Sequence, residues 1–150
     1  MAYEFFGKLP IVYTDLETTG PIGSRWKAQL NENGKTHAFC NVFPEMNHNE
    51  IVGWESLKDT ETFLPHLGAV LLRTGTESSQ NRKRMDITKG LIQEKGISLF
   101  DLQAEGESLL DKWIYLISLG DWFSFYLAIA YQADPTEIKN INHLKEQLKK

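Results

Sequence analysis

The feature that most constrains the fold of this 150-residue chain is an alternation of strand-like and helix-like segments. Short apolar runs, typical of buried strands, are separated by longer segments in which apolar residues recur every three or four positions. The predicted strands are Leu9–Thr14, His37–Phe43, Gly68–Arg73 and Ile97–Gln103. Such alternation favours an α/β fold, in which a parallel sheet is covered by helices on both faces.

Local signals predict where the helices begin and end. A helix is expected over Ile22–Asn33, with Gly34 as its stop signal. An N-x-x-E capping box at Asn47 and Glu50 predicts a short helix through Trp54. The other helices are expected over Asn81–Lys95, from Ser108 to about Gln132 with Asp111 completing the cap, and from Asp134 with Pro135 at its first position and Glu137 completing the cap. No internal repeat or domain boundary interrupts the pattern, so we expect residues 1–150 to form one domain.

Composition excludes several classes of protein. A hydrophobic content of 41% is sufficient for an ordinary core. The net charge of −4, with both signs interspersed, argues against a nucleic-acid-binding surface. The single cysteine, Cys40, cannot form an internal disulfide, and four histidines without a cysteine cluster argue against a structural zinc site.

The apolar segments argue against membrane insertion. Met1–Pro10 contains an acidic residue and lacks the long apolar stretch of a signal peptide. Leu109–Gln132 is interrupted by charged residues, and its longest uncharged stretch, Trp122–Ala133, is shorter than the roughly 18 residues of a membrane span. We therefore expect a buried helix here, in a soluble, cytoplasmic protein.

Two ionisable side chains stand at predicted helix ends. Glu32 lies in the last turn of the predicted helix Ile22–Asn33, and His48 lies in the first turn of the next one. Partial charges at these ends disfavour the charged form of each group. A base near neutral pH and a neutral imidazole suit the enolisation of a sugar. The simpler alternatives are a surface Glu32 paired with Lys27 or Lys35, and an exposed His48 ring.

A lysine near the end of the chain lies on an apolar stripe. Ile138, Ile141, Lys145 and Leu148 follow helical spacing, which places Lys145 among apolar neighbours. Such a lysine commonly extends its ammonium group into water. Within a partly apolar cleft it could instead bind a ring or carbonyl oxygen, or donate a proton. Lys139 is the main competitor for this role.

Two loops have the position of phosphate-binding loops but little of their chemistry. Thr14–Ser24 follows a predicted strand and precedes a helix, where free N–H groups can meet an anion. Asp15 and Glu17 oppose an anion there. Thr74–Ser79 is rich in hydroxyl groups but more often such a stretch marks an ordinary turn, and neither loop matches a known phosphate-binding motif.

Two motifs make the chain recognisable: N-E-N-G-K at Asn31–Lys35 and N-H-N-E-I-V-G-W-E at Asn47–Glu55. With them, the chain resembles the C-terminal sugar isomerase (SIS) domain of bifunctional phosphoglucose/phosphomannose isomerases. The resemblance extends to A-E-G-E-S-L-L at Ala104–Leu110, L-G-D-W at Leu119–Trp122, and D-P-T…L-K at Asp134–Lys145. It covers nearly the whole chain and implies a flavodoxin-like SIS fold.

The resemblance also implies a reaction. Members of the family interconvert glucose 6-phosphate or mannose 6-phosphate with fructose 6-phosphate through a cis-enediol. Glu32 matches the base that moves a proton between C1 and C2. His48 matches a ring-opening histidine that enters the active site from the neighbouring subunit, and Lys145 matches a ring-opening lysine. We expect no metal and no organic cofactor, because the carbonyl of the substrate is the electron sink.

The resemblance further implies a partner. In the family, the loops that grip the sugar phosphate belong mainly to the N-terminal SIS domain, and an arginine attributed to stabilising the enediolate also lies outside the matched region. We therefore expect a homodimer or a partner N-terminal SIS domain. Thr14–Asp15 stands where the family has a Gly-Ser pair, so the resemblance does not imply the family's geometry for that loop.

Two other functions are compatible with the sequence. The chain could be a non-catalytic sugar-phosphate-binding or dimerisation module, because SIS domains also serve as sensors. It could also be a structural subunit that completes a dimer. The long helix would supply the apolar surface through Trp113, Tyr115, Trp122, Phe123 and Phe125, although these aromatic residues more often belong to a core.

Overall fold

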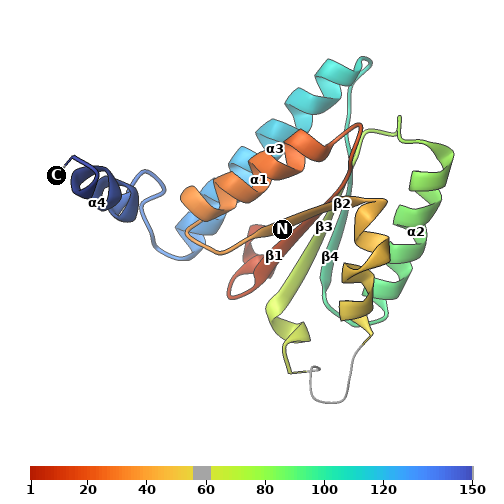
Figure 1. Ribbon diagram of the computed structural model, residues 1–150, viewed down its shortest axis with the longest axis horizontal. Coiled ribbons are helices and arrows are strands. Elements are labelled where there is room, and N and C mark those ends of the chain that lie inside the picture. Colours follow the sequence, from red (N-terminus) through yellow and green to blue (C-terminus); the bar gives the residue numbers. More distant parts are fainter. Residues whose placement is uncertain (56–61, 150) are drawn as a thin grey trace.

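Four parallel strands form a single sheet in the order β2-β1-β3-β4 in the computed structural model, which describes residues 1–55 and 62–149 (Figure 1). The strands are β1 (Leu9–Asp15), β2 (Phe39–Phe43), β3 (Leu67–Arg73) and β4 (Ser98–Gln103). In the central strand, Val12 pairs with Cys40 of β2 on one side and with Val70 of β3 on the other. The predicted strands and their parallel arrangement are confirmed.

Helices cover both faces of this sheet, as the alternation predicts (Figure 1). The α-helices are α1 (Gly20–Glu32), α2 (Ser79–Gln93), α3 (Leu109–Ala130) and α4 (Lys139–Gln147). The short 3₁₀ turns are η1 (Ala2–Phe5), η2 (Glu45–His48), η3 (Glu50–Trp54) and η4 (Leu64–His66). One face is covered by α1 and α3, the other by α2, η2 and η3. The last helix, α4, projects away from these layers.

The core has one layer on each side of the sheet, because successive side chains of a strand point to opposite faces. Val12 and Val70 pack with Trp26 of α1 in the first layer. Tyr13 and Leu71 belong to the second layer, together with residues of α2, η2 and η3. β1 and β3 are buried on both faces, which explains their continuously apolar runs in the sequence.

The helices α1 and α3 are closely docked. Gly120 lies directly against the Trp26 ring, where a side chain on residue 120 would collide with it. The indole Nε1 of Trp26 donates a hydrogen bond to the backbone oxygen of Leu116 at 2.8 Å. Arg25 and Asp121 form an ion pair at 3.0 Å across the same contact. This contact fixes the direction of α1 and therefore the position of its last turn.

The predicted helix from Asn47 to Trp54 is wrong. The segment forms two 3₁₀ turns that are separated at Asn49, whose side chain accepts a hydrogen bond from Glu50 N at 2.6 Å. The Glu50 carboxylate does not return to the backbone of Asn47 to complete a cap. It accepts hydrogen bonds from the Tyr13 hydroxyl at 2.6 Å and from Asn41 Nδ2 at 2.7 Å.

The predicted start of the last helix is also wrong. The Asp134 carboxylate accepts hydrogen bonds from the backbone N and the hydroxyl of Thr136, at 2.8 and 2.7 Å, and so closes a turn. The carbonyls of Pro135 and Glu137 accept hydrogen bonds from Lys35 Nζ. Because these groups are engaged elsewhere, α4 begins only after them.

The start of α3 is predicted correctly, but its burial is not. Ser108 and Asp111 form the expected capping box. By length and composition α3 could cross a membrane, and 33% of its most apolar window is buried inside the domain. Phe123 packs in the core, whereas Trp122 and Phe125 are exposed. The prediction of a buried helix therefore holds for one face of α3.

Candidate functional site

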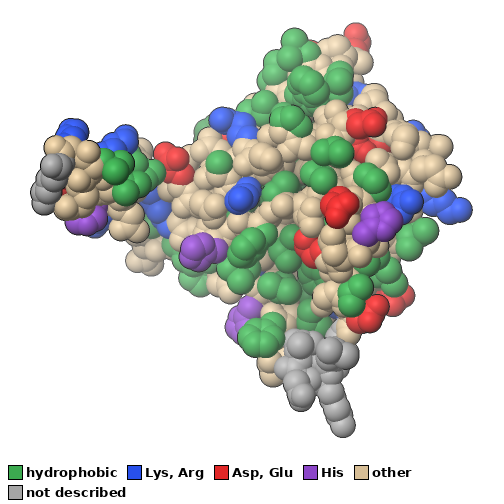
Figure 2. Space-filling view, in the orientation of Figure 1, with side chains coloured by type: hydrophobic (Ala, Val, Ile, Leu, Met, Phe, Trp, Pro, Cys, Tyr) green, Lys and Arg blue, Asp and Glu red, His purple; other side chains and the backbone are tan. Residues whose placement is uncertain are grey.

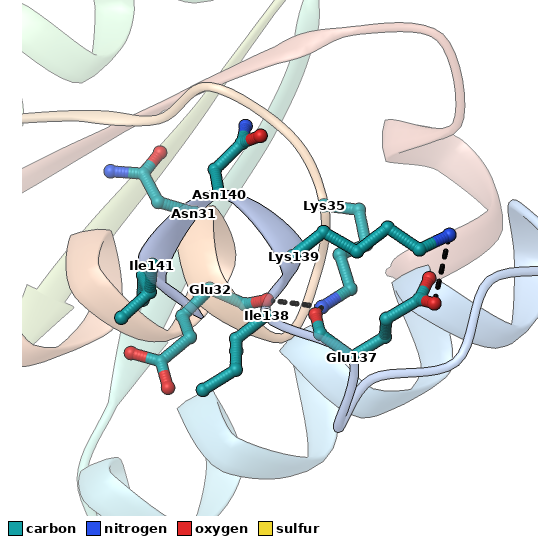
Figure 3. Close-up of a pocket in the computed structure, with 8 residues that line it drawn as sticks. All are labelled: Asn31, Glu32, Lys35, Glu137, Ile138, Lys139, Asn140 and Ile141. Atoms are coloured by element: carbon teal, nitrogen blue, oxygen red, sulfur yellow. Dashed lines mark hydrogen bonds and ion pairs between the residues drawn. The ribbon is translucent and has the colours of Figure 1, made fainter. Parts of the chain in front are cut away.

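Glu32 lines a pocket between the end of α1 and the start of α4 (Figure 3). The cavity has a volume of about 330 Å³. Its other walls come from residues 31, 35 and 137–141. Glu32 lies in the last turn of α1, as predicted, and is its final residue; its side chain is exposed. The sequence thus places a carboxylate where a small molecule could reach it.

Lys35 joins the two walls of this pocket. Its ammonium group donates hydrogen bonds to the carbonyl of Glu32 at 2.8 Å, to that of Pro135 at 3.2 Å, and to that of Glu137. Lys35 has a φ of 55°, in the left-handed region, and follows Gly34 at the end of α1. The lysine therefore fixes the chain before α4 against the last turn of α1.

The Glu32 carboxylate is not used for this connection. Within residues 1–55 and 62–149 it forms no ion pair with Lys27 or Lys35. Figure 3 shows the carboxylate directed away from the Lys35 ammonium group. The acidic neighbour in the pocket, Glu137, is paired with Lys139 at 2.8 Å. Glu32 therefore keeps a carboxylate that is available to a ligand.

The asparagine that precedes Glu32 has a structural role. Asn31 Oδ1 accepts a hydrogen bond from Ala38 N at 2.8 Å, just before β2. This bond holds the connection between α1 and β2 in a compact turn. The N-E-N motif therefore combines a free carboxylate with a neighbour that orders the backbone beside it.

His48 is exposed and ends η2, on the face of the sheet opposite α1. Its position corrects the prediction that it stands in the first turn of an α-helix. The turn is anchored by Met46, which is fully buried, and by Asn47, whose Nδ2 donates to Thr88 Oγ1 of α2 at 3.0 Å.

Within one chain, Glu32 and His48 are not brought together. Because β1 and β2 are parallel, α1 runs from the carboxyl ends of the strands back to their amino ends, and Glu32 lies at the amino-end edge. His48 follows the carboxyl end of β2. The two residues also belong to elements on opposite faces of the sheet (Figure 1).

Lys145 lies in the last turn of α4 and is exposed. It does not line the pocket beside Glu32, whereas its competitor Lys139 does. The apolar residues predicted to share its stripe are also accessible, with Ile141 and Leu148 among the exposed large side chains. In this chain alone, no apolar cleft among the described residues surrounds the ammonium group of Lys145.

The two loops considered for phosphate lie at the carboxyl ends of adjacent strands, where ligands bind in many parallel α/β folds. In the first loop, Thr14–Ser24, the carboxylate of Asp15 already accepts the hydrogen bonds of the loop. Asp15 Oδ1 accepts hydrogen bonds from Glu17 N at 3.1 Å, and from the N and hydroxyl of Thr18, both at 2.9 Å. Its Oδ2 accepts from Asn81 Nδ2 at 2.7 Å. This carboxylate occupies the place that a phosphate would take.

The second loop is filled in the same way by Glu77, which sequence reasoning missed. Glu77 is only 3% exposed, and its Oε1 accepts hydrogen bonds from Thr74 N, the Thr74 hydroxyl and Gly75 N at 2.5, 3.0 and 3.2 Å. The sequence contained a signal for this contact. Glu77 follows Thr74 by three residues, which is the spacing at which an acidic side chain accepts a hydrogen bond from the backbone N–H of the earlier residue. Both loops therefore lack free N–H groups at the positions that these carboxylates occupy.

Comparison with known proteins identifies relatives over the full length of the domain. Residues 1–148 match the family described as "Bacterial phospho-glucose isomerase C-terminal SIS domain". The chain is 44% identical over 148 residues to a bifunctional phosphoglucose/phosphomannose isomerase of Caldicellulosiruptor bescii, covering 99% of this chain and 43% of that protein. It is 37% identical over 150 residues to the same-named protein of Aquifex aeolicus, covering 100% of this chain and 45% of that protein.

The fold has a solved counterpart. A glucose-6-phosphate isomerase-like protein from Thermus thermophilus superposes with a TM-score of 0.73 at 22% identity, over 91% of this chain and 44% of that one. The predicted SIS fold is therefore confirmed. The chain spans less than half the length of these relatives.

Proposed function

Because the chain belongs to the family of bacterial phosphoglucose isomerase C-terminal SIS domains, we propose that it supplies the catalytic-base half of a sugar-phosphate isomerase. The observation that carries the proposal is the Glu32 carboxylate, exposed and without an ion pair among the described residues, in the pocket between α1 and α4. The substrates proposed are glucose 6-phosphate and mannose 6-phosphate, which are converted to fructose 6-phosphate.

Glu32 acts as a general base and then as a general acid. Its carboxylate removes the proton from C2 of the open-chain aldose, and the electron pair of the C–H bond forms the C1=C2 bond of a cis-enediol while the C1 oxygen takes up a proton from the solvent. The carboxylic acid then returns its proton to C1, while the O2 hydroxyl releases a proton to the solvent and becomes the ketone. General acid–base catalysis by one positioned group contributes about 10²–10⁴-fold.

A second copy of the chain completes the site in this proposal. His48 assists ring opening, and Lys145 binds or protonates the ring oxygen. Glu32 and His48 lie at opposite edges and on opposite faces of the sheet, which supports a site assembled from two copies rather than one. The ring-opening residue is then supplied by a neighbouring copy.

The sugar phosphate is held by another part of the complete enzyme. Asp15 and Glu77 fill both loops at the carboxyl ends of the strands with their own carboxylates. A phosphate placed there would have to displace a buried carboxylate from its hydrogen bonds, which is unfavourable. The phosphate grip therefore comes from the region that relatives carry outside the matched domain.

The test uses a chimera in which the part of the Caldicellulosiruptor bescii isomerase that precedes the matched domain is joined to Met1. The Glu32→Gln chimera is expected to lose about 10²–10⁴-fold in kcat, because the amide cannot accept the C2 proton. Binding of fructose 6-phosphate, measured by calorimetry, is expected to stay within a few fold. Glu107→Gln, an identical change at an exposed position, serves as the control.

Near-normal turnover of the Glu32→Gln chimera would reject Glu32 as the base. The same experiment addresses the second candidate, a non-catalytic sugar-phosphate-binding or dimerisation module. A chimera that binds fructose 6-phosphate without any turnover, with Glu32 intact, would support the module.

A further inference from the structure

The outer side of α3 carries an apolar surface that nothing in the described chain covers. Trp122, Tyr126 and Ile129 are 58%, 54% and 49% exposed. The rings of Trp122 and Tyr126 stack with centroids 5.8 Å apart, so they present a continuous surface. A cavity of about 350 Å³ lies between these side chains and the first residues of the chain. We call this surface the α3 face, formed by Met1, Ala2, Tyr3, Trp122, Tyr126 and Ile129.

The start of the chain is fixed on this face. Phe5 is fully buried and packs edge-on against Phe123 of α3, with ring centroids 5.2 Å apart. Gly7 N donates a hydrogen bond to the Tyr131 hydroxyl at 2.8 Å, just beyond the end of α3. Met1 therefore lies at a defined place beside the exposed aromatic side chains.

The relatives carry a large additional segment outside the part that this chain matches. The matches to two bifunctional isomerases cover 99% and 100% of this chain but only 43% and 45% of those proteins. The matched family is a C-terminal domain and its match begins at residue 1, so in the relatives the preceding polypeptide joins at the position that corresponds to Met1. A preceding domain would therefore be tethered directly beside the α3 face, which raises its effective concentration there.

We propose that the α3 face is the docking surface for the preceding half of the isomerase, which binds it through an apolar contact around Trp122, Tyr126 and Ile129. The inference rests on the proposed function, because it assumes that this domain works with a second half. Exposed patches of stacked aromatic and aliphatic side chains are typical of protein interfaces. A second copy of this chain would be a separate molecule and would gain no such increase in effective concentration, so it is the weaker candidate for binding the α3 face.

The test compares this chain with the chimera that carries the preceding part of the Caldicellulosiruptor bescii isomerase. Hydroxyl-radical footprinting, resolved by mass spectrometry, measures the oxidation rates of Trp122 and Tyr126. Both rates are expected to fall severalfold in the chimera, whereas that of Ile87, which is 55% exposed on α2, is expected to stay the same. Glu32→Gln chimeras are expected to give the same protection, which separates docking from catalysis.

A binding experiment with matched variants completes the test. The preceding part, added as a separate chain, is titrated against this chain by calorimetry. Ile129→Gln is expected to weaken binding about tenfold or more, because a buried isoleucine is lost from the contact, whereas Ile87→Gln is expected to leave binding unchanged.

Several outcomes would overturn the proposal. Unchanged oxidation of Trp122 in the chimera would show that the face stays open, and this readout holds even if the separate preceding part does not fold. Equal effects of Ile129→Gln and Ile87→Gln on the binding affinity would show that binding does not depend on the α3 face. Self-association of the isolated chain that Ile129→Gln abolishes would assign the face to a second copy. Protection of Trp122 by phosphatidylglycerol vesicles would assign it to a membrane.

Discussion

Glu50 joins the segment that carries His48 to the centre of the sheet. Its carboxylate accepts hydrogen bonds from the Tyr13 hydroxyl of β1 and from Asn41 of β2. The Tyr13 oxygen in turn accepts from Trp54 Nε1 at 2.9 Å. These bonds fix the two 3₁₀ turns on the domain by polar contacts that are buried or partly buried. The position of the exposed His48 ring therefore depends on a buried tyrosine of β1.

Tyr13 is expected to make the free energy of unfolding fall at alkaline pH. Burial, followed by the charge of Glu50, raises the pKa of the Tyr13 hydroxyl far above its ordinary value. The neutral phenol is therefore favoured in the folded chain. This contribution is complete below about pH 10, the pKa of an unfolded tyrosine, and is lost as the pH rises above it.

Tyr13→Phe tests this dependence. At neutral pH it is expected to cost about 1–3 kcal/mol of unfolding free energy, because Trp54 and Glu50 lose a partner. Above about pH 10 the wild-type chain is expected to lose up to about 1.4 kcal/mol per pH unit more than the variant. Urea unfolding at several pH values measures both effects, with Tyr3→Phe as the exposed control. Parallel pH profiles for the two variants and the wild type would contradict the assignment.

At the scale of elements, three predicted caps show what sequence can and cannot determine. The spacing of Ser108 and Asp111 forms the expected box, because no distant group competes for either side chain. The equivalent spacing of Asn47 and Glu50 does not form a cap, because the Glu50 carboxylate accepts hydrogen bonds from residues of two strands instead. The cap at Asp134 fails, because nearby carbonyls bind Lys35, about a hundred positions earlier in the chain. Local spacing predicts a cap only where tertiary partners are absent.

The attachment of α4 depends on one side chain. Lys35 Nζ donates to three carbonyls, two of them in the segment that leads into α4. The described residues of α4 are all exposed, and Figure 2 shows the helix as a separate projection with hydrophobic and basic side chains. The position of α4, and with it the second wall of the Glu32 pocket, therefore depends on this lysine.

Lys35→Met is expected to loosen α4 while the core stays intact. The methionine keeps the apolar stem but cannot donate to the carbonyls of Pro135 and Glu137. Hydrogen exchange of residues 139–147 is expected to accelerate severalfold, with a small change in Tm, because α4 buries little surface. Lys27→Met, an exposed position on α1, is the matched control. Unchanged exchange in α4 would show that other contacts hold the helix.

At the scale of the whole molecule, the sheet was more predictable than the site. Apolar runs such as Gly68–Arg73 determine buried strands locally, so the α/β fold followed from the pattern. The position of Glu32 at the end of α1 also followed, because Gly34 ends the helix after it. The relation between Glu32 and His48 did not follow. It depends on which face of the sheet each connection crosses, and a one-dimensional pattern does not contain that information.

This relation gives the last prediction, which concerns the assembly. If one active site takes Glu32 from one copy and His48 from another, chimeras carrying Glu32→Gln or His48→Gln are each inactive as homodimers. A mixed dimer, purified with two different tags, then has one site with both changes and one site with neither. Its kcat is expected to be about half that of the wild type, because a two-fold axis makes two equivalent sites.

The opposite arrangement gives a different result. If Glu32 and His48 acted from the same copy, every site of the mixed dimer would carry one change, and activity would stay at the level of the homodimeric variants. A dimer of two differently tagged Glu32→Gln chimeras controls for the tags. Recovery of activity in the mixed dimer alone would therefore mean that opposite faces of one sheet serve two different active sites, and that the domain is catalytically complete only as an assembly.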